Sequence, residues 1–298
     1  MNVQLGCQMR FETSERSERK NWVKETLLKA GYRILSFEGF TIYQGRVSLL
    51  LDRACFDGEE RIWSEDEICR ELKTRLSDSY ALKARFSEML GTPWYFVAYT
   101  YNSQKITNRI YVFQLSRDTS SLRETFPTAQ RFGEWLAQFR SLQMTSGYQE
   151  TGLPCFDREL RKCQHPWPGN LDGVLVCPSG GILCVLEFQT TLAVSVRAHC
   201  NNQWFLPSAN RKGDEQRWKV VDILRKQARL PLMILVWSPN EQEIKVKIVK
   251  EIVYSDDPDG RKPGLYYTYK EVMEKSRLLQ ILQNWCGRVP RETESALS

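Results

Sequence analysis

The segment Gly169-Asn-Leu-Asp-Gly-Val-Leu-Val-Cys-Pro-Ser-Gly-Gly-Ile-Leu-Cys-Val-Leu-Glu-Phe-Gln189 determines the fold that we predict for the second half of the chain. Two apolar runs flank the turn-forming sequence Pro-Ser-Gly-Gly at residues 178–181, which is typical of a β-hairpin. A hairpin that turns at this sequence pairs Asp172 with Glu187. The two carboxylates are therefore expected side by side at the open end of the hairpin.

A divalent metal ion would explain this acid pair. Because strand side chains alternate between faces, Glu187 and Gln189 point to one side and Phe188 to the other. Adjacent carboxylates repel each other unless a cation lies between them. A hard ion with oxygen ligands, Mg²⁺ or Mn²⁺, suits Asp172 and Glu187, and the carbonyl oxygen of Phe188 is a further candidate ligand. Such a site can polarise a phosphodiester and lower the pKa of bound water.

This arrangement resembles the PD-(D/E)XK, or restriction-endonuclease-like, nuclease superfamily over residues 128–240. The resemblance lies in Asp172, the apolar hairpin, the sequence Glu187-Phe-Gln189, and the helix and apolar strand that follow. It implies that Asp172 and Glu187 bind Mg²⁺ and that Gln189 stands where the superfamily usually has a catalytic Lys. The superfamily often adds a Glu from its first helix, and Glu159 is our candidate for that role, with Glu134 and Glu150 as competitors.

Two departures from the superfamily pattern leave two hypotheses open. Leu171 replaces the usual Pro, which the superfamily tolerates. Gln189 replaces the Lys, and an amide can neither act as a base nor carry positive charge. Some restriction enzymes with Glu-x-Gln are active, and Lys219 could substitute for the missing Lys. The alternative is a non-catalytic protein that binds nucleic acid or has an assembly role and retains the nuclease fold.

A basic segment follows the hairpin at residues 197–229. It contains eight Lys or Arg residues and three acids, so it carries 8 − 3 = +5 of the net charge of +6. Basic side chains interspersed with amides and aromatic rings are suited to phosphate and base contacts. The residues predicted to contact nucleic acid are Arg197, Asn201, Gln203, Arg211, Lys212, Gln216 and Arg217. The alternative interpretation is an ordinary solvated charged face.

Composition restricts the remaining function classes. The chain has 298 residues, 42% of them hydrophobic and 26% charged, which is typical of a globular protein and excludes disordered and fibrous classes. Nine cysteines in an irregular spacing favour reduced thiols and an intracellular, cytoplasmic protein. The absence of a long apolar run argues against membrane insertion. A zinc site using Cys155, Cys163, His165, His199 and Cys200 fits no compact ligand pattern.

Periodicity predicts an α/β protein whose two halves have a similar order of elements. Helices are expected at residues 14–30, 64–90, 128–142, 214–228 and 270–285. Strands are expected at residues 32–37, 47–55, 94–101, 109–115, 171–177, 182–188, 232–237 and 244–253. A linker is expected at residues 116–127. It separates an α/β domain at residues 1–125, which would serve nucleic-acid recognition or dimerisation, from a restriction-endonuclease-like domain at residues 126–298. The second domain is expected to have a mixed central sheet flanked by helices. The repeated order suggests a degenerate duplication.

These observations lead to one functional hypothesis. We expect a Mg²⁺- or Mn²⁺-dependent nuclease that hydrolyses phosphodiester bonds, most simply a DNA endonuclease rather than a ribonuclease. Cleavage of both strands needs two active sites, which predicts a homodimer. No role for a membrane is expected.

Overall fold

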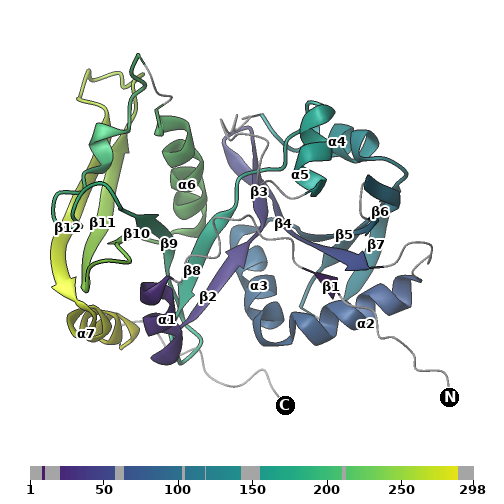
Figure 1. The fold of residues 1–298 in the computed structure, drawn as a ribbon, viewed down its shortest axis with the longest axis horizontal. Coiled ribbons are helices and arrows are strands. Elements are labelled where there is room, and N and C mark those ends of the chain that lie inside the picture. The colour runs from purple at the N-terminus through teal and green to yellow at the C-terminus, as the bar shows by residue number, and fades with distance from the viewer. Residues whose placement is uncertain are drawn as a thin grey trace. The chain divides into compact units, whose positions relative to one another are not determined.

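Two compact units make up the chain. The computed structural model describes residues 9–10, 21–57, 64–102, 105–117, 119–141, 155–209 and 213–287 (Figure 1). Unit 1 comprises Met1–Glu18 and Phe37–Asn170, and unit 2 comprises Arg19–Ser36 and Leu171–Ser298. This division differs from the expected boundary between residues 125 and 126, because segments of the two units alternate along the chain.

Unit 1 contains a mixed six-stranded sheet in which β4 and β5 are parallel and the neighbouring strands pair antiparallel. Its strands are β1 (Met9–Arg10), β3 (Gly39–Tyr43), β4 (Arg46–Asp57), β5 (Trp94–Asn102), β6 (Lys105–Leu115) and β7 (Ser120–Phe126). Its helices are α2 (Glu65–Arg75), α3 (Ser77–Leu90), α4 (Ala129–Ala137) and α5 (Cys155–Lys162). Strand β7 lies where the sequence suggested a linker, so that prediction was wrong.

Unit 2 contains a second mixed six-stranded sheet with the order β12-β11-β10-β9-β8-β2. Its strands are β2 (Arg33–Phe37), β8 (Leu171–Val176), β9 (Ile182–Thr190), β10 (Leu232–Trp237), β11 (Glu243–Val253) and β12 (Gly264–Glu274). Its helices are α1 (Trp22–Lys29), α6 (Glu215–Ala228) and α7 (Lys275–Cys286), with a short 3-10 turn η2 (Asn201–Gln203). The predicted hairpin, helix and apolar strand of this unit are confirmed as β8, β9, α6 and β10.

Local sequence signals set several helix ends. Asn21 and Thr128 accept backbone N–H bonds at the first turns of α1 and α4, and Ser64 forms a capping box with Glu67 at α2. The long helix expected at 64–90 is interrupted at Leu76, which ends α2 and precedes α3. The helix expected at 270–285 begins only at Lys275, because the residues before it extend β12 along β11.

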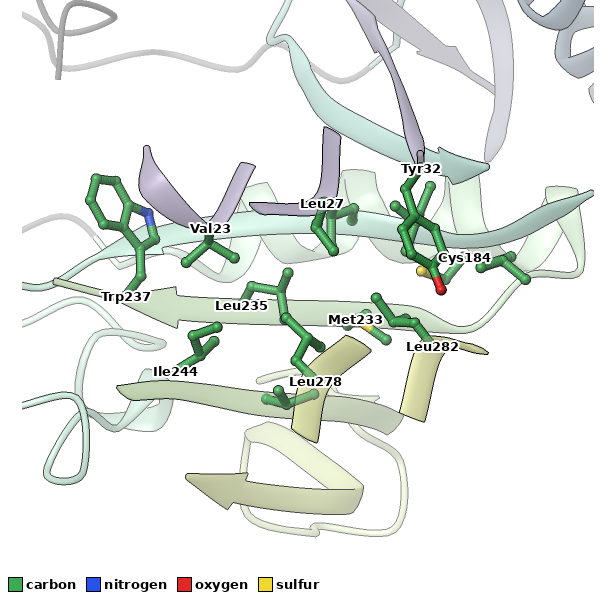
Figure 2. Close-up of a cluster of buried hydrophobic side chains, with 14 of the residues drawn as sticks. Val23, Leu27, Tyr32, Cys184, Met233, Leu235, Trp237, Ile244, Leu278 and Leu282 are labelled. Carbon is green, nitrogen blue, oxygen red and sulfur yellow. The ribbon is translucent and has the colours of Figure 1, made fainter. Parts of the chain in front are cut away.

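One face of the unit 2 sheet is covered by two helices from opposite ends of the chain. Figure 2 shows that side chains of α1 and α7 converge on the apolar residues of β10. The labelled side chains of this cluster are Val23, Leu27, Tyr32, Cys184, Met233, Leu235, Trp237, Ile244, Leu278 and Leu282. Since side chains alternate along a strand, Glu187 projects from the opposite face, where α6 packs.

The architecture is thus α/β, with two mixed sheets and seven α-helices among the described residues. None of these helices is both long enough and apolar enough to cross a membrane.

Candidate functional site

The acid pair lies at the open end of the β8–β9 hairpin. Gly173 pairs with Leu186, so the next position along the hairpin brings Asp172 opposite Glu187. The backbone N–H of Phe188 donates a hydrogen bond of 2.9 Å to Asp172 Oδ2. Glu187 is buried, with 1% of its surface exposed, whereas the Asp172 side chain retains 24%. The hairpin register predicted from the sequence therefore agrees with the structure.

An arginine from α6 lies against both carboxylates. Arg217 Nη2 donates a hydrogen bond to Glu187 Oε2 and lies 3.9 Å from Asp172 Oδ2. The sequence analysis placed Arg217 against nucleic acid, but in this structure its guanidinium supplies the cation that the acid pair needs. Glu187 Oε1 and Asp172 Oδ1 accept no hydrogen bond from the described residues.

One arginine does not fully compensate the buried Glu187 and the partly buried Asp172. Burial and the neighbouring Asp172 together raise the pKa of Glu187 to about 7, against the lowering effect of Arg217. Burial also raises the pKa of Asp172 above its ordinary value. The pKa of Arg217 is raised by Glu187. Among the described residues, Arg217 is the one cation that forms an ion pair with these two carboxylates, and the raised pKa values favour additional positive charge at the site.

Gln189 belongs to a buried hydrogen-bond network on the same face of the sheet. Its Oε1 accepts a bond of 2.6 Å from Asn201 Nδ2. Asn201 Oδ1 in turn accepts bonds from Lys247 Nζ and from the Tyr267 hydroxyl, the latter at 3.2 Å. Because these groups donate to Oδ1, the Asn201 amide is oriented with its NH₂ group toward Gln189. Gln189 must then present its oxygen to Asn201, and its own NH₂ group stays free to donate.

Lys247 is the buried cation at the far end of this network. It lies on β11 with 0% of its surface exposed, and its Nζ is 3.1 Å from Nδ1 of His199. Burial, together with the charges of Lys245 and Lys270, lowers the pKa of Lys247 to about 7. Burial and the charges of Lys247 and Lys245 lower the pKa of His199 to about 4, so His199 is neutral at pH 7.

Lys247 should make folding stability depend on pH. Its pKa falls from an ordinary value of 10.5 to about 7 on folding, so between these values the unfolded chain binds the extra proton and stability rises with pH. Relative to Lys247→Met, the unfolding free energy of the unchanged protein should rise by about 1 kcal/mol per pH unit from pH 7 to 9. Urea denaturation measures this difference, and the exposed Lys250→Met is the matched control. A difference independent of pH would contradict a lysine that loses its proton on folding.

Other predicted site residues lie elsewhere. Glu159 is in α5 of unit 1, where its carboxylate pairs with Lys162 at 2.8 Å. Lys219 lies two residues from Arg217 on α6, which places it on another side of the helix, and its ammonium lies 3.9 Å from Asp256. Neither residue has a described contact with the acid pair. Phe188 pairs with Leu235 in the sheet, and its carbonyl as a metal ligand stays a prediction.

The predicted basic surface is partly neutralised. Asn201 is buried, with 3% exposed, and so is not available to nucleic acid in this structure. Arg197 forms a paired hydrogen bond with Glu243, and Arg225 and Lys226 both pair with Asp222. Gln203 is exposed on η2, and Gln216 lines an open pocket at the start of α6 together with Lys219, Glu215 and Asp256. Arg211 and Lys212 lie outside the described residues.

Sequence reasoning missed the supporting network of this site. The sequence indicated His199 only as a candidate zinc ligand, and it did not indicate Lys247 or Tyr267 as site residues. No sequence signal indicates a buried Lys247, because the alternation of Lys with apolar residues in β11 is typical of a strand with one face in solvent. Among the described residues, no group of three or more His, Cys, Asp or Glu side chains is arranged to bind a metal, so neither the zinc alternative nor a third carboxylate gains support.

Comparison with known proteins gives no assignment. No family model matches the chain, and no curated protein matches it. Among solved structures, the chain has a weak similarity to the C-terminal domain of the sex pheromone staph-cAM373 precursor from Staphylococcus aureus. The TM-score is 0.16 with 9% sequence identity, covering 75% of this chain and 65% of that one. A similarity at this level carries no argument about fold or function.

Proposed function

We propose that the protein is a Mg²⁺- or Mn²⁺-dependent nuclease of the restriction-endonuclease-like type that hydrolyses phosphodiester bonds of DNA. The observation that carries this proposal is the acid pair of Asp172 and Glu187 with Gln189 beside it, on one face of a hairpin. The hairpin leads through α6 into the parallel strand β10, within a mixed sheet covered by helices on both faces. This is the arrangement of elements that the superfamily resemblance implies.

The residues of the site fit a hard divalent ion. Asp172 Oδ1 and Glu187 Oε1 are carboxylate oxygens with no described partner, and burial raises the pKa of both acids. These two residues would hold the ion, with Arg217 moving away from Glu187. The Arg217 side chain is 41% exposed, so it has room to do so. When bound, the ion would lower the pKa of a water molecule and stabilise charge on the phosphate.

Gln189 and Arg217 have separate roles in this proposal. Gln189 presents N–H donors beside Glu187, as a lysine would, and can orient a water molecule or a phosphate oxygen without accepting a proton. Arg217, once released from Glu187, can donate a paired hydrogen bond to a phosphate. Two copies of the chain acting as a homodimer would supply the two sites that double-strand cleavage needs.

Incubation with plasmid DNA tests this function. We expect nicked or linear plasmid in Mg²⁺ or Mn²⁺ and none with a chelator, with the activity lost in Asp172→Ala and Glu187→Ala. Glu274→Ala, which removes an exposed carboxylate elsewhere in unit 2, is the matched control and should cleave normally. Equal cleavage by the two site variants would overturn the site assignment.

One observation favours a second candidate function. Arg217 already occupies the position of a cation against Glu187, as it would in a descendant that binds nucleic acid or assembles without catalysis. In that case the unchanged protein would cleave no DNA with either metal. It would still bind DNA with an affinity that falls as the salt concentration rises.

A further inference from the structure

The two sheets share one order of connection. In unit 1 the hairpin β3–β4 is followed by α2 and α3, then by β5 parallel to β4, the antiparallel strands β6 and β7, and helix α4. In unit 2 the hairpin β8–β9 is followed by α6, then by β10 parallel to β9, the antiparallel strands β11 and β12, and helix α7. The repeated pattern in the sequence thus corresponds to a repeated topology.

The junction between helix and parallel strand is also repeated. In each unit a residue with positive φ ends the helix and a proline precedes the strand: Gly91 and Pro93 in unit 1, Arg229 and Pro231 in unit 2. The carbonyl of each proline accepts a backbone N–H bond from the hairpin, from Leu50 at 3.0 Å and from Val185 at 2.9 Å. Leu50 and Val185 therefore mark the same place in the two sheets.

A second acid pair follows from this correspondence. Two residues beyond Val185 lies Glu187, and two residues beyond Leu50 lies Asp52. Gly39 pairs with Leu51, so the next position brings Glu38 opposite Asp52. The sequence Glu38-Gly39 thus matches Asp172-Gly173. Burial raises the pKa of Glu38, Arg53 lowers it, and the charge of Asp52 raises it, as expected for two acids at neighbouring positions.

Each pair also has a cation from the helix that follows its hairpin. Lys83 of α3 donates to both carboxylate oxygens of Asp52, at 2.8 and 2.7 Å. Arg217 of α6 donates to Glu187. Lys83 lies eight residues before Gly91, which ends α3, and Arg217 lies twelve residues before Arg229, which ends α6. The two positions differ by four residues, about one helical turn, so both cations lie on the helix face toward their sheet.

We infer that Glu38, Asp52 and Lys83 are the counterpart in unit 1 of Asp172, Glu187 and Arg217, inherited by duplication, and that Lys83 closes this second site to metal ions. Trp94 Nε1 donates a third bond to Asp52, at 2.8 Å, and Asp52 is only 4% exposed. In unit 2 one oxygen of each acid accepts no hydrogen bond from any residue that the structure describes, and the arginine is partly exposed. One chain therefore has one site open to metal and one closed site, an inference that rests on the proposed function for the open site.

Calorimetric titration of the full chain with Mn²⁺ tests this inference. We expect one ion per chain, lost in Asp172→Asn and retained in Asp52→Asn. Removing the lysine with Lys83→Met should expose the second pair, so that this variant binds a second ion and Mn²⁺ raises its melting temperature. Adding Glu38→Gln to Lys83→Met should abolish the second binding event.

Each outcome bears on one claim. Two ions bound to the unchanged chain, one of them lost in Asp52→Asn, would show that Lys83 does not close unit 1. A folded Lys83→Met variant that gains no ion would overturn the correspondence of the acid pairs. If Lys83→Met does not fold without metal, refolding it with and without Mn²⁺ gives the same test. If the unchanged chain binds no ion but Lys83→Met binds one, the proposed function is overturned. The correspondence between the acid pairs of the two units would still hold.

Discussion

The Gln189→Glu variant should cleave DNA at least about 100-fold more slowly than the unchanged protein. Asn201 holds Gln189 Oε1, so the free group of Gln189 is its NH₂ donor. A glutamate can still accept the Asn201 bond, but it has no N–H to offer a water molecule or a phosphate. The negative charge also repels the phosphate. We therefore expect the activity to be lost while Mn²⁺ affinity, measured by calorimetry, is kept or increased.

A role of Gln189 as a metal ligand predicts the opposite effect of Gln189→Glu on the cleavage rate. If its oxygen were a metal ligand, a carboxylate in its place would be a stronger ligand, and cleavage would be retained or enhanced. Gln283→Glu introduces the same change of charge at an exposed position of α7 and should leave the rate unchanged. Cleavage kinetics at saturating Mn²⁺ distinguish the two roles.

Lys83→Met should destabilise the protein by about 3–5 kcal/mol, because it leaves the Asp52 carboxylate buried without its cation. Of the bonds to Asp52 from described residues, the one from Trp94 would remain. The double variant Asp52→Leu with Lys83→Met replaces both charges by apolar groups of similar shape, so it should recover most of this loss. Urea denaturation at neutral pH and without metal measures both variants.

The exposed pair of Arg117 and Glu88 provides the control for this prediction. Its side chains are 50% and 52% exposed, so Arg117→Met should cost less than about 1 kcal/mol. A similarly small cost for Lys83→Met would mean that Asp52 is not buried in solution as it is in this structure.

The parts of the fold that follow local patterns were predictable from the sequence. The hairpin around residues 178–181, the continuous apolar strand β10 and helix α6 each have a strong local signal. Strand β7 has none, because only its pairing with β6 makes the polar residues at 120–126 a strand. Residues 270–274 were predicted as part of a helix, but they form the end of strand β12 because they pair with β11.

Some residues of the candidate site could also be predicted from local sequence, whereas others depend on tertiary packing. Hairpin geometry brings Asp172 and Glu187 together, so the acid pair could be predicted. The roles of Arg217 and Lys247 depend on which helix and strand pack over the hairpin, which requires tertiary structure. The second acid pair escaped notice because Asp52-Arg-Ala54 and Glu187-Phe-Gln189 share only one acidic position. Their equivalence is visible in the strand registers rather than in the residue identities.

Residues 37–170 of unit 1 lie between the two sequence segments of unit 2, and this placement constrains how the chain can fold. Strand β2 ends at Phe37 and its neighbour β8 begins at Leu171, so closing this pair as an open coil requires the ordering of a very long loop. Loop closure grows more costly with loop length, whereas a folded insert fixes its two ends at a constant separation. We expect unit 1 to fold first and act as the connector that brings the edge strand and α1 to the second sheet. Breaking the chain between α1 and β3 should therefore cost unit 2 its helix and edge strand while leaving the acid-pair hairpin in one piece.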